Sequence, residues 1–247
     1  MKEKIYTIPV NDAFAATGAC PLCTLAATMT ENLLQYYLGP ALMEPDVRKT
    51  TNEKGFCREH LAALYNREEN RLGLGLLLHT HTSDLVSDLN PALSRSAPAG
   101  GARLFSGRKK DFRQSLLAAA DKIEERARSC VICERLDYTM DRYLDVIFFQ
   151  YFTEPSFKKQ FDECQGYCLP HLALLLRGAA KYLNQNQAAE FVSQLALIQN
   201  RSLQALCDDI EWFTQKFDYR NQNKDWKNSR DALPRAINKI RGDCGLK

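Results

Sequence analysis

The sequence predicts an all-α protein built from two pseudo-symmetric helical repeats, each with a three-cysteine, one-histidine metal site. Two observations support this fold class: apolar residues recur every three or four positions along much of the chain, and one set of cysteine and histidine motifs occurs twice. No convincing pattern of alternating apolar and polar residues indicates a strand. With 247 residues, 45% hydrophobic and 26% charged, the chain can build a core of its own.

The clearest helical period lies in the C-terminal third, where Phe191, Leu195 and Ile198 begin a stripe that continues to Phe217. This stripe predicts one long amphipathic helix over Gln187 to Phe217. A short helix is expected from Leu233 to Ile240. A further amphipathic helix is indicated by a stripe formed of Leu72, Leu76, His79, Val86 and Leu89.

The repeat consists of two motifs that occur twice in the same order. In the first copy, Cys20-Pro-Leu-Cys23 is followed by Gly55-Phe56-Cys57-Arg-Glu-His60. In the second, Cys130-Val-Ile-Cys133 is followed by Gly166-Tyr167-Cys168-Leu-Pro-His171, at offsets of 110 and 111 positions. Glu44-Pro45 and Glu154-Pro155 also align at 110 positions, and each proline suits the first turn of a helix.

The repeat also predicts how the chain is divided. We expect a first metal-binding helical repeat over residues 1–95 and a second over residues 111–220. The segment between them, 96–110, belongs to a stretch rich in Pro, Gly, Ser and Ala and is expected to be a linker. Residues 221–247 form a polar C-terminal tail with the short helix noted above.

Each repeat is predicted to bind one metal ion through its own four ligands. A Cys-x-x-Cys turn brings two thiolates to one ion, and a Cys-x-x-His at the start of a helix places both ligands on one face. The positive end of that helix favours the thiolate, and the glycine two residues before the third cysteine lets the chain bend toward the metal. The predicted metal ligands are Cys20, Cys23, Cys57 and His60 in the first repeat, and Cys130, Cys133, Cys168 and His171 in the second.

Zinc is the expected metal, with two ions per chain, because a closed set of three sulfurs and one nitrogen suits its tetrahedral preference. An iron–sulfur cluster with the same four ligands is the alternative, and the sequence does not separate the two. A thioredoxin-like dithiol at Cys20 and Cys23, or eight buried residues without a metal, would explain the duplicated spacing less well. A site with four protein ligands has no open position, so a structural role is expected.

Several other residues carry two interpretations. Glu44 and Glu154 are candidate acceptors for the histidine N–H, or simply helix N-caps. Cys164 is a candidate extra ligand near the second site. His79 is expected in the core, with His81 exposed or lining a cleft. The remaining features are Cys207, expected to pack, and Asp218-Tyr219-Arg220, either an ion-paired helix cap or a ligand contact.

Composition narrows the classes of function and partner. The net charge of +3 does not indicate a nucleic-acid partner, and no run of 18 apolar residues indicates a membrane span. The polar N-terminus and nine cysteines predict a cytoplasmic protein that uses its thiols for metal or redox chemistry. We find no P-loop, dinucleotide-binding turn or nucleophile elbow, so catalysis is not predicted.

The sequence resembles a bacterial family described only as a domain of unknown function and known mainly from anaerobes. The resemblance covers most of the chain and implies a shared fold and shared sites, without an activity to carry over. It also implies a larger role for Asp218, Tyr219 and Arg220 than a helix cap. The motifs that carry it are both Cys-x-x-Cys pairs, both Gly-x-Cys-x-x-His motifs, Met43-Glu-Pro-Asp-Val-Arg48, Thr51-Asn52, Asn70-Arg-Leu-Gly73, Thr80-His81 and Phe217-Asp-Tyr-Arg220.

From these features we expect a zinc-stabilised helical protein that binds or scaffolds a protein or small-molecule partner without catalysis. The alternative is an iron–sulfur or thiol-based redox or accessory protein, which the duplicated cysteine sites and the link to anaerobes would favour. A nucleic-acid-binding regulator is a weaker possibility, because charge and aromatic placement do not indicate one.

Overall fold

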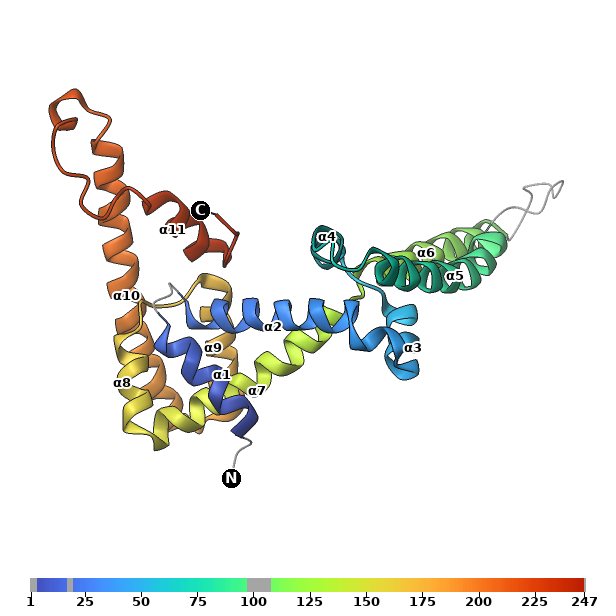
Figure 1. Cartoon of the computed structure of the whole chain (residues 1–247), viewed down its shortest axis with the longest axis horizontal. Coiled ribbons are helices and arrows are strands. Elements are labelled where there is room, and N and C mark those ends of the chain that lie inside the picture. Colours follow the sequence, from blue (N-terminus) through green and yellow to red (C-terminus); the bar gives the residue numbers. More distant parts are fainter. Residues whose placement is uncertain (1–3, 17–19, 97–107, 247) are drawn as a thin grey trace. The chain divides into compact units, whose positions relative to one another are not determined.

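The computed structural model describes residues 4–16, 20–96 and 108–246 and confirms the all-α fold class (Figure 1). Within these ranges the regular structure is entirely helical. The α-helices are α1 Lys4–Ala15, α2 Pro21–Leu38, α3 Pro45–Lys54, α4 Arg58–Asn66, α5 Arg71–Ser96, α6 Arg108–Arg128, α7 Val131–Thr153, α8 Pro155–Glu163, α9 Leu169–Tyr182, α10 Gln185–Gln215 and α11 Ala232–Arg241. Two short 3₁₀ turns, η1 Pro40–Met43 and η2 Tyr219–Asn221, complete the set. Most of the predicted linker, residues 97–107, lies outside the described residues.

The predicted C-terminal helices are confirmed with small shifts at their ends. The long stripe forms α10, which begins two residues earlier than predicted because Asn184 caps it. The Asn184 side chain accepts a hydrogen bond from the Gln187 N–H, and the Gln187 side chain accepts one from the Asn184 N–H. The predicted short helix forms α11. Pro45 and Pro155 lie in the first turns of α3 and α8, as their ring geometry favours.

The described chain divides into two compact units, and their boundaries differ from the predicted repeats. Unit 1 contains residues 1–28 and 138–247, and unit 2 contains residues 29–137. The chain therefore passes from one unit to the other inside α2 and again inside α7. A continuous helix can contribute its two ends to two different cores. The predicted division at the Pro- and Gly-rich segment assumed instead that each helix belongs to one repeat.

Unit 1 is packed around aromatic side chains. Tyr151 of α7, Phe161 of α8 and Phe191 of α10 are each at most 2% exposed. Their ring centroids lie 5.0 to 5.1 Å from one another, in edge-to-face and tilted arrangements. Phe14 of α1 adds a fourth ring, 4.9 Å from Phe157. These contacts join helices from both ends of the chain within this unit.

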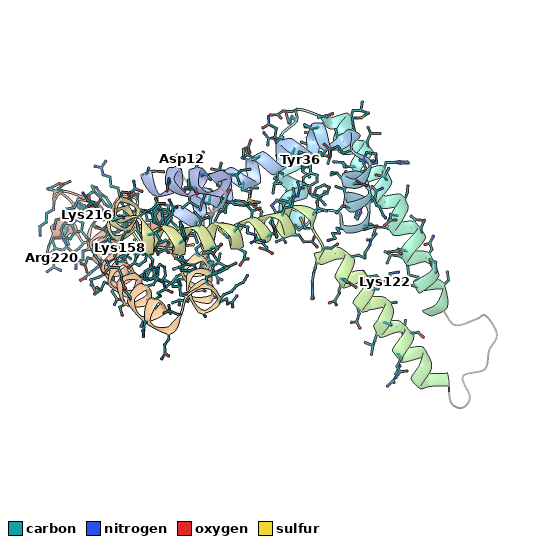
Figure 2. The ribbon with its side chains drawn as sticks, turned by 90° about the horizontal axis from the view of Figure 1, so that it is seen from below. Asp12, Tyr36, Lys122, Lys158, Lys216 and Arg220 are labelled. Carbon is teal, nitrogen blue, oxygen red and sulfur yellow. The ribbon has the colours of Figure 1, made fainter. Side chains whose placement is uncertain are left out.

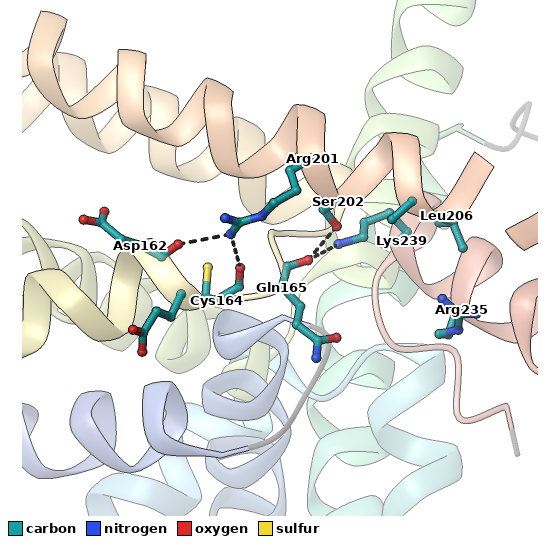
Figure 3. A pocket seen from close by; sticks show the side chains of 10 residues that line it. Asp162, Cys164, Gln165, Arg201, Ser202, Leu206, Arg235 and Lys239 are labelled. Carbon is teal, nitrogen blue, oxygen red and sulfur yellow. Dashed lines mark hydrogen bonds between the residues drawn. The ribbon is translucent and has the colours of Figure 1, made fainter. Parts of the chain in front are cut away.

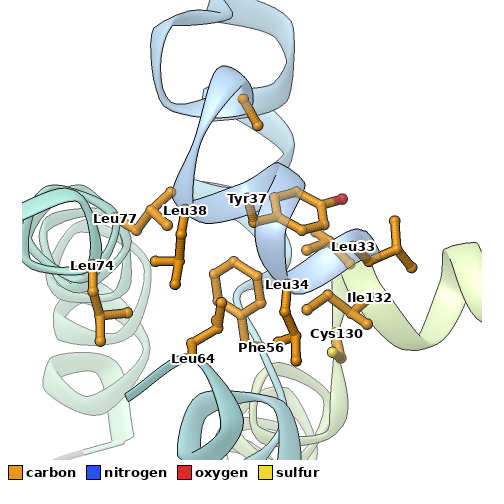
Figure 4. Close-up of a cluster of buried hydrophobic side chains, with 12 residues drawn as sticks. Leu33, Leu34, Tyr37, Leu38, Phe56, Leu64, Leu74, Leu77, Cys130 and Ile132 are labelled. Carbon is orange, nitrogen blue, oxygen red and sulfur yellow. The ribbon is translucent and has the colours of Figure 1, made fainter. Parts of the chain in front are cut away.

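Unit 2 has a separate core in which the last turns of α2 meet the start of α7 (Figure 4). Leu34 and Tyr37 of α2 pack with Phe56, and the Tyr37 and Phe56 ring centroids are 5.5 Å apart. Ile132, next to Cys133, is completely buried in the same cluster. The second cysteine pair therefore lies against the hydrophobic core of unit 2.

The stripe on α5 is not buried as its apolar residues would predict. Leu72, Leu76 and Val86 are 76%, 50% and 52% exposed, and His79, expected in the core, is also exposed. The inward face of α5 is instead formed by Leu74 and Leu77, which contact the unit 2 core, and by residues that pair with α6. The prediction of a helix was correct, but the orientation assigned to it was wrong.

A separate result concerns membranes: among the described helices, none is both long and apolar enough to cross a bilayer.

Candidate metal centres

The eight predicted ligands gather into two groups of three cysteines and one histidine, each of which could hold a metal ion. Cluster A consists of Cys20, Cys23, Cys168 and His171, and cluster B of Cys57, His60, Cys130 and Cys133. These are the eight residues named from the sequence, but the predicted pairing of their motifs was wrong. Each Cys-x-x-Cys shares a cluster with the Cys-x-x-His of the other sequence repeat.

The division of the chain into two units accounts for the exchanged pairing. Cys20 and Cys23 lie at the start of α2, in unit 1, and the chain passes into unit 2 inside that helix. Cys57 and His60 therefore belong to unit 2, as Cys130 and Cys133 do, whereas Cys168 and His171 belong to unit 1. Each Cys-x-x-Cys forms a cluster with the Cys-x-x-His that lies in its own unit.

The same local structure presents the ligands in both clusters. Each Cys-x-x-Cys opens a long helix, α2 or α7. Each Cys-x-x-His places its cysteine at the N-cap with extended backbone, at Cys57 before α4 and Cys168 before α9. The histidine follows three residues later in the first helical turn, and the positive end of the helix dipole favours thiolate at the capping cysteine.

Cluster A has the spacing of a tetrahedral site. The His171 Nδ1 atom lies 3.1, 3.3 and 3.6 Å from the sulfurs of Cys168, Cys23 and Cys20. The Cys168 sulfur lies 3.6 Å from that of Cys23 and 3.9 Å from that of Cys20. A zinc ion with ordinary bond lengths would separate tetrahedral sulfurs by about 3.8 Å and sulfur from nitrogen by about 3.6 Å. The five distances match these edges to within about half an ångström.

Cluster B repeats this spacing. The His60 Nδ1 atom lies 3.2 Å from the sulfur of Cys57 and 3.4 Å from each sulfur of Cys130 and Cys133. The Cys57 and Cys133 sulfurs are 3.7 Å apart. In both clusters the histidine directs Nδ1 inward, which leaves Nε2 as the nitrogen for an outer hydrogen bond.

The thiols of cluster A are hydrogen-bonded to one another, and these contacts shift their pKa values. Hydrogen bonds with Cys168 and Cys23 lower the pKa of the Cys20 thiol, whereas hydrogen bonds with Cys168 and Cys20 raise the pKa of Cys23. Burial would lower the pKa of His171, but its hydrogen bonds to Cys168 and Cys20 outweigh burial and raise the pKa to about 9. In cluster B, burial and the hydrogen bond with Cys130 raise the pKa of Cys133. A divalent ion would replace the thiol protons and hold the sulfurs as thiolates.

The glycines before the third cysteines have a more specific role than general bending. Gly55 and Gly166 have φ of 62° and 79°, a region that favours glycine. A Cβ atom on Gly55 would lie 2.5 Å from the His81 ring, and one on Gly166 would lie 2.8 Å from Ser202 Cβ. Each glycine therefore permits both the turn and the close approach of a helix, α5 or α10, behind the cysteine.

The helices behind the clusters also bond to these turns. Gln199 of α10, 4% exposed, accepts a hydrogen bond from the Tyr167 N–H and donates one to the Tyr167 carbonyl oxygen. His81 of α5 lies with Nδ1 2.8 Å from the Asn52 carbonyl oxygen. His81 is half-buried, and its ring lies beside Gly55, two residues before Cys57. The sequence offered no signal for Gln199 beyond its position on the stripe of α10.

Neither role proposed for Glu44 and Glu154 is found. Both occupy N-cap positions, yet neither side chain accepts a capping hydrogen bond. The Glu44 carboxylate accepts a hydrogen bond from the Tyr36 hydroxyl, and that of Glu154 accepts one from Gln150. The repeated glutamates thus bond to the helix that precedes each turn, and neither contacts a cluster histidine through a described bond.

The other candidate residues lie outside both clusters. Cys164 is half-buried and belongs to neither group, and Cys207, expected to pack, is exposed because it faces away from the stripe of α10. Asp218 caps η2 by accepting a hydrogen bond from the Arg220 N–H and also pairs with the Arg220 guanidinium. The ion-paired cap is therefore formed, while Tyr219 is 80% exposed.

A cavity of about 380 Å³ borders cluster A, lined by residues that include Cys20, Cys23 and Cys168. Lys239 of α11 lines this cavity and also a neighbouring one of about 430 Å³ (Figure 3). Lys239 is 8% exposed, and its ammonium donates to the carbonyl oxygen of Gln165, three residues before Cys168. No described carboxylate forms an ion pair with Lys239. Burial lowers the pKa of its ammonium group, and the nearby thiols of cluster A partly offset this effect. Sequence reasoning missed Lys239, since a lysine in a polar tail gives no signal of burial.

Comparison with known proteins gives a family. Among the curated proteins and among the solved structures, no match to this chain is found. A family model described as a family of unknown function matches residues 1–247, the whole length of the chain. The chain therefore belongs to the DUF6062 family, a family of unknown function.

Proposed function

We propose that this chain is a zinc protein that holds one ion in cluster A and one in cluster B, and that the ions stabilise a helical scaffold for a partner. The observation that carries the proposal is the spacing of the donor atoms, 3.1 to 3.9 Å in both clusters. This spacing suits four ligands on a single ion. A four-iron cluster attaches its ligands to four different irons, and the donor atoms would then lie farther apart.

The roles of the two ions follow from their ligands. Each ion would have four protein ligands and no open position, so it would stabilise the fold and would not activate a substrate. All nine cysteines are free, which agrees with a reducing compartment and supports a cytoplasmic location. We expect the partner to be a protein or a small molecule, and a nucleic acid is not favoured by a net charge of +3.

The decisive experiment is elemental analysis of protein purified without added metal and without oxygen. We expect close to two equivalents of zinc per chain and no visible absorption band. The Cys207→Ser variant is the matched control, because this exposed cysteine belongs to neither cluster and its loss should leave the zinc content unchanged. A folded, stable protein without metal would refute the proposal.

A thiol-based redox role at cluster A is the second candidate, and the cavity beside its three sulfurs favours it. Zinc thiolates that a small oxidant can reach form disulfides and release the ion. Titration with hydrogen peroxide should then release one zinc well before the other, and mass spectrometry should locate the first disulfide in cluster A. Simultaneous release of both ions would exclude this role.

A further inference from the structure

The outer face of α5 carries a regular stripe that no described residue covers. Its members are Leu72, Leu76, His79, Ser83, Val86, Asn90 and Leu93, and all seven are exposed. They are spaced alternately four and three residues apart over the whole helix, which is the 3.5-residue repeat of a coiled-coil seam. We call these seven residues the outer stripe.

The opposite face of α5 is already occupied. Asp84 and Asp88 form ion pairs with Arg126 and Lys122 of α6, at 2.7 and 3.4 Å. Figure 2 labels Lys122 on α6. Nearer the start of α5, Leu74 and Leu77 pack into the unit 2 core. The outer stripe is therefore the face that remains after both intramolecular contacts have formed.

The outer stripe of α5 contains no Asp, Glu, Lys or Arg residue. Between residues 72 and 94 the only charged residues are Asp84 and Asp88, and both pair with α6. Arg71 and Arg95 lie at the two ends of α5, and Arg71 stacks on the Tyr65 ring. Arg48 of α3 donates to the Leu76 carbonyl oxygen and the Thr80 hydroxyl at one edge of the stripe. An exposed helix normally carries charged residues on its solvent face, whereas interface cores are depleted of them. A helix lying on a membrane surface would carry lysine or arginine along its apolar face, whereas the arginines of α5 lie only at its two ends.

We propose that two copies of this chain associate through α5, outer stripe against outer stripe. An uncharged face requires an uncharged partner face, and a second α5 supplies one. In a parallel pair, a coiled coil sets each seam position against the same position of its partner. Asn90 then meets Asn90 of the second copy, and Ser83 meets Ser83, so the polar seam positions are matched with polar ones. An isologous contact of this kind closes into a dimer without open ends.

The test uses the full-length protein and sedimentation equilibrium over about 1 to 100 μM chain, a range that detects micromolar association. We expect a monomer–dimer equilibrium that does not weaken as salt is raised, because no ion pair forms the contact. Val86→Glu would place like charges in the seam and should weaken the dimer by roughly tenfold or more. Asn90→Leu should strengthen association or change its stoichiometry, as expected when a polar seam residue is removed.

Leu117→Glu is the matched control, because Leu117 is 64% exposed on α6 and is not part of the outer stripe. It should leave the equilibrium unchanged. Val86 is itself exposed, so Val86→Glu should keep the circular dichroism spectrum of the wild type and report on association alone. A wild type that stays monomeric at 100 μM would overturn the proposal, as would a Val86→Glu variant that dimerises like wild type.

Discussion

Clusters A and B have the same ligand types and similar spacing, yet their surroundings differ. In cluster B, Cys130 is buried in the unit 2 core, and the neighbouring Val131 N–H bonds to the Gly55 carbonyl oxygen at 3.1 Å. In cluster A, three cysteines border a cavity, and α11 places Lys239 beside them. The ligand set determines what chemistry a cluster can perform, whereas the surroundings determine how far that chemistry is accessible to small molecules.

The clusters also differ in the length of chain that they close. Cys23 and Cys168 of cluster A are 145 residues apart, and His60 and Cys130 of cluster B are 70 apart. Closing the longer loop costs more conformational entropy, by about 0.6 kcal/mol for each doubling. Cluster A therefore restricts the unfolded chain somewhat more, while cluster B receives more support from its hydrophobic surroundings.

The largest expected effect comes from double variants that distinguish the two pairings. Cys20→Ser with Cys168→Ser should remove one zinc and leave one, because both changes fall in cluster A. Cys20→Ser with Cys57→Ser should remove both ions. Native mass spectrometry counts the ions directly. The pairing expected from the sequence repeat gives the opposite pattern, so a single ion retained by Cys20→Ser/Cys57→Ser would refute the exchanged clusters.

Single variants should destabilise the unit that contains the cluster. Structural zinc contributes about 10–16 kcal/mol in small peptides, and part of that is replaced here by the hydrophobic cores. We expect Cys168→Ser to cost a few kcal/mol, a large share of a typical total of about 5–15 kcal/mol. Hydrogen exchange should rise mainly in residues 138–246 for Cys168→Ser and within residues 29–137 for Cys57→Ser.

A uniform rise across both units in either variant would contradict this assignment. A chelator gives an independent check, since it should lower the melting temperature of the wild type. It should have a smaller effect on each single variant, which has one ion left to lose.

Substitution of either turn glycine by alanine should lower the free energy of unfolding by a similar amount, and by less than loss of a cluster cysteine. Gly55→Ala and Gly166→Ala each force an L-residue into positive φ and a Cβ against α5 or α10. We expect each to cost about 1–3 kcal/mol in unfolding free energy, measured by urea denaturation. Gly75→Ala is the control, because a Cβ there meets nothing within 4 Å and the site is helical. That change should stabilise α5 by about 0.5–1 kcal/mol; equal losses at all three sites would exclude the role assigned to the turns.

The smallest effect tests the environment of cluster A alone. Lys239→Met should weaken zinc binding to cluster A by up to about tenfold, the low end of the range for partners of metal ligands, because Lys239 bonds to the Gln165 carbonyl oxygen and not to a ligand. Binding to cluster B should not change. Competition with a chromophoric chelator measures both affinities, and Lys181→Met, an exposed lysine paired with Asp141, is the control. Equal loss at both clusters would mean that Lys239 acts on overall stability.

Much of this molecule could be predicted from sequence, and the failures have a common physical origin. Helical periods and proline positions are local signals, and they predicted the helices correctly. The eight cysteine and histidine residues gather in two groups, and their binding of a metal stays a prediction. The pairing of the motifs was not local: it depends on how the chain passes between the two units inside α2 and inside α7. The same is true of Lys239 and Gln199, whose burial follows from packing between distant segments. The outer stripe on α5 is the opposite case: its helical period is clear in the sequence, but a period alone does not show whether a helix face is buried or exposed.

The exchanged pairing has a consequence for the order in which the protein matures on the ribosome. Cluster B is complete once Cys133 has emerged, but Cys20 and Cys23 must wait until His171 has been made. At about 5–20 residues per second, the 145 residues between Cys23 and Cys168 take about 7 to 30 s to translate. In the proposed zinc protein, the thiols of Cys20 and Cys23 stay without metal during that interval and are open to oxidation or to the wrong ion. Zinc uptake should therefore be vectorial, with cluster B filled first and cluster A last.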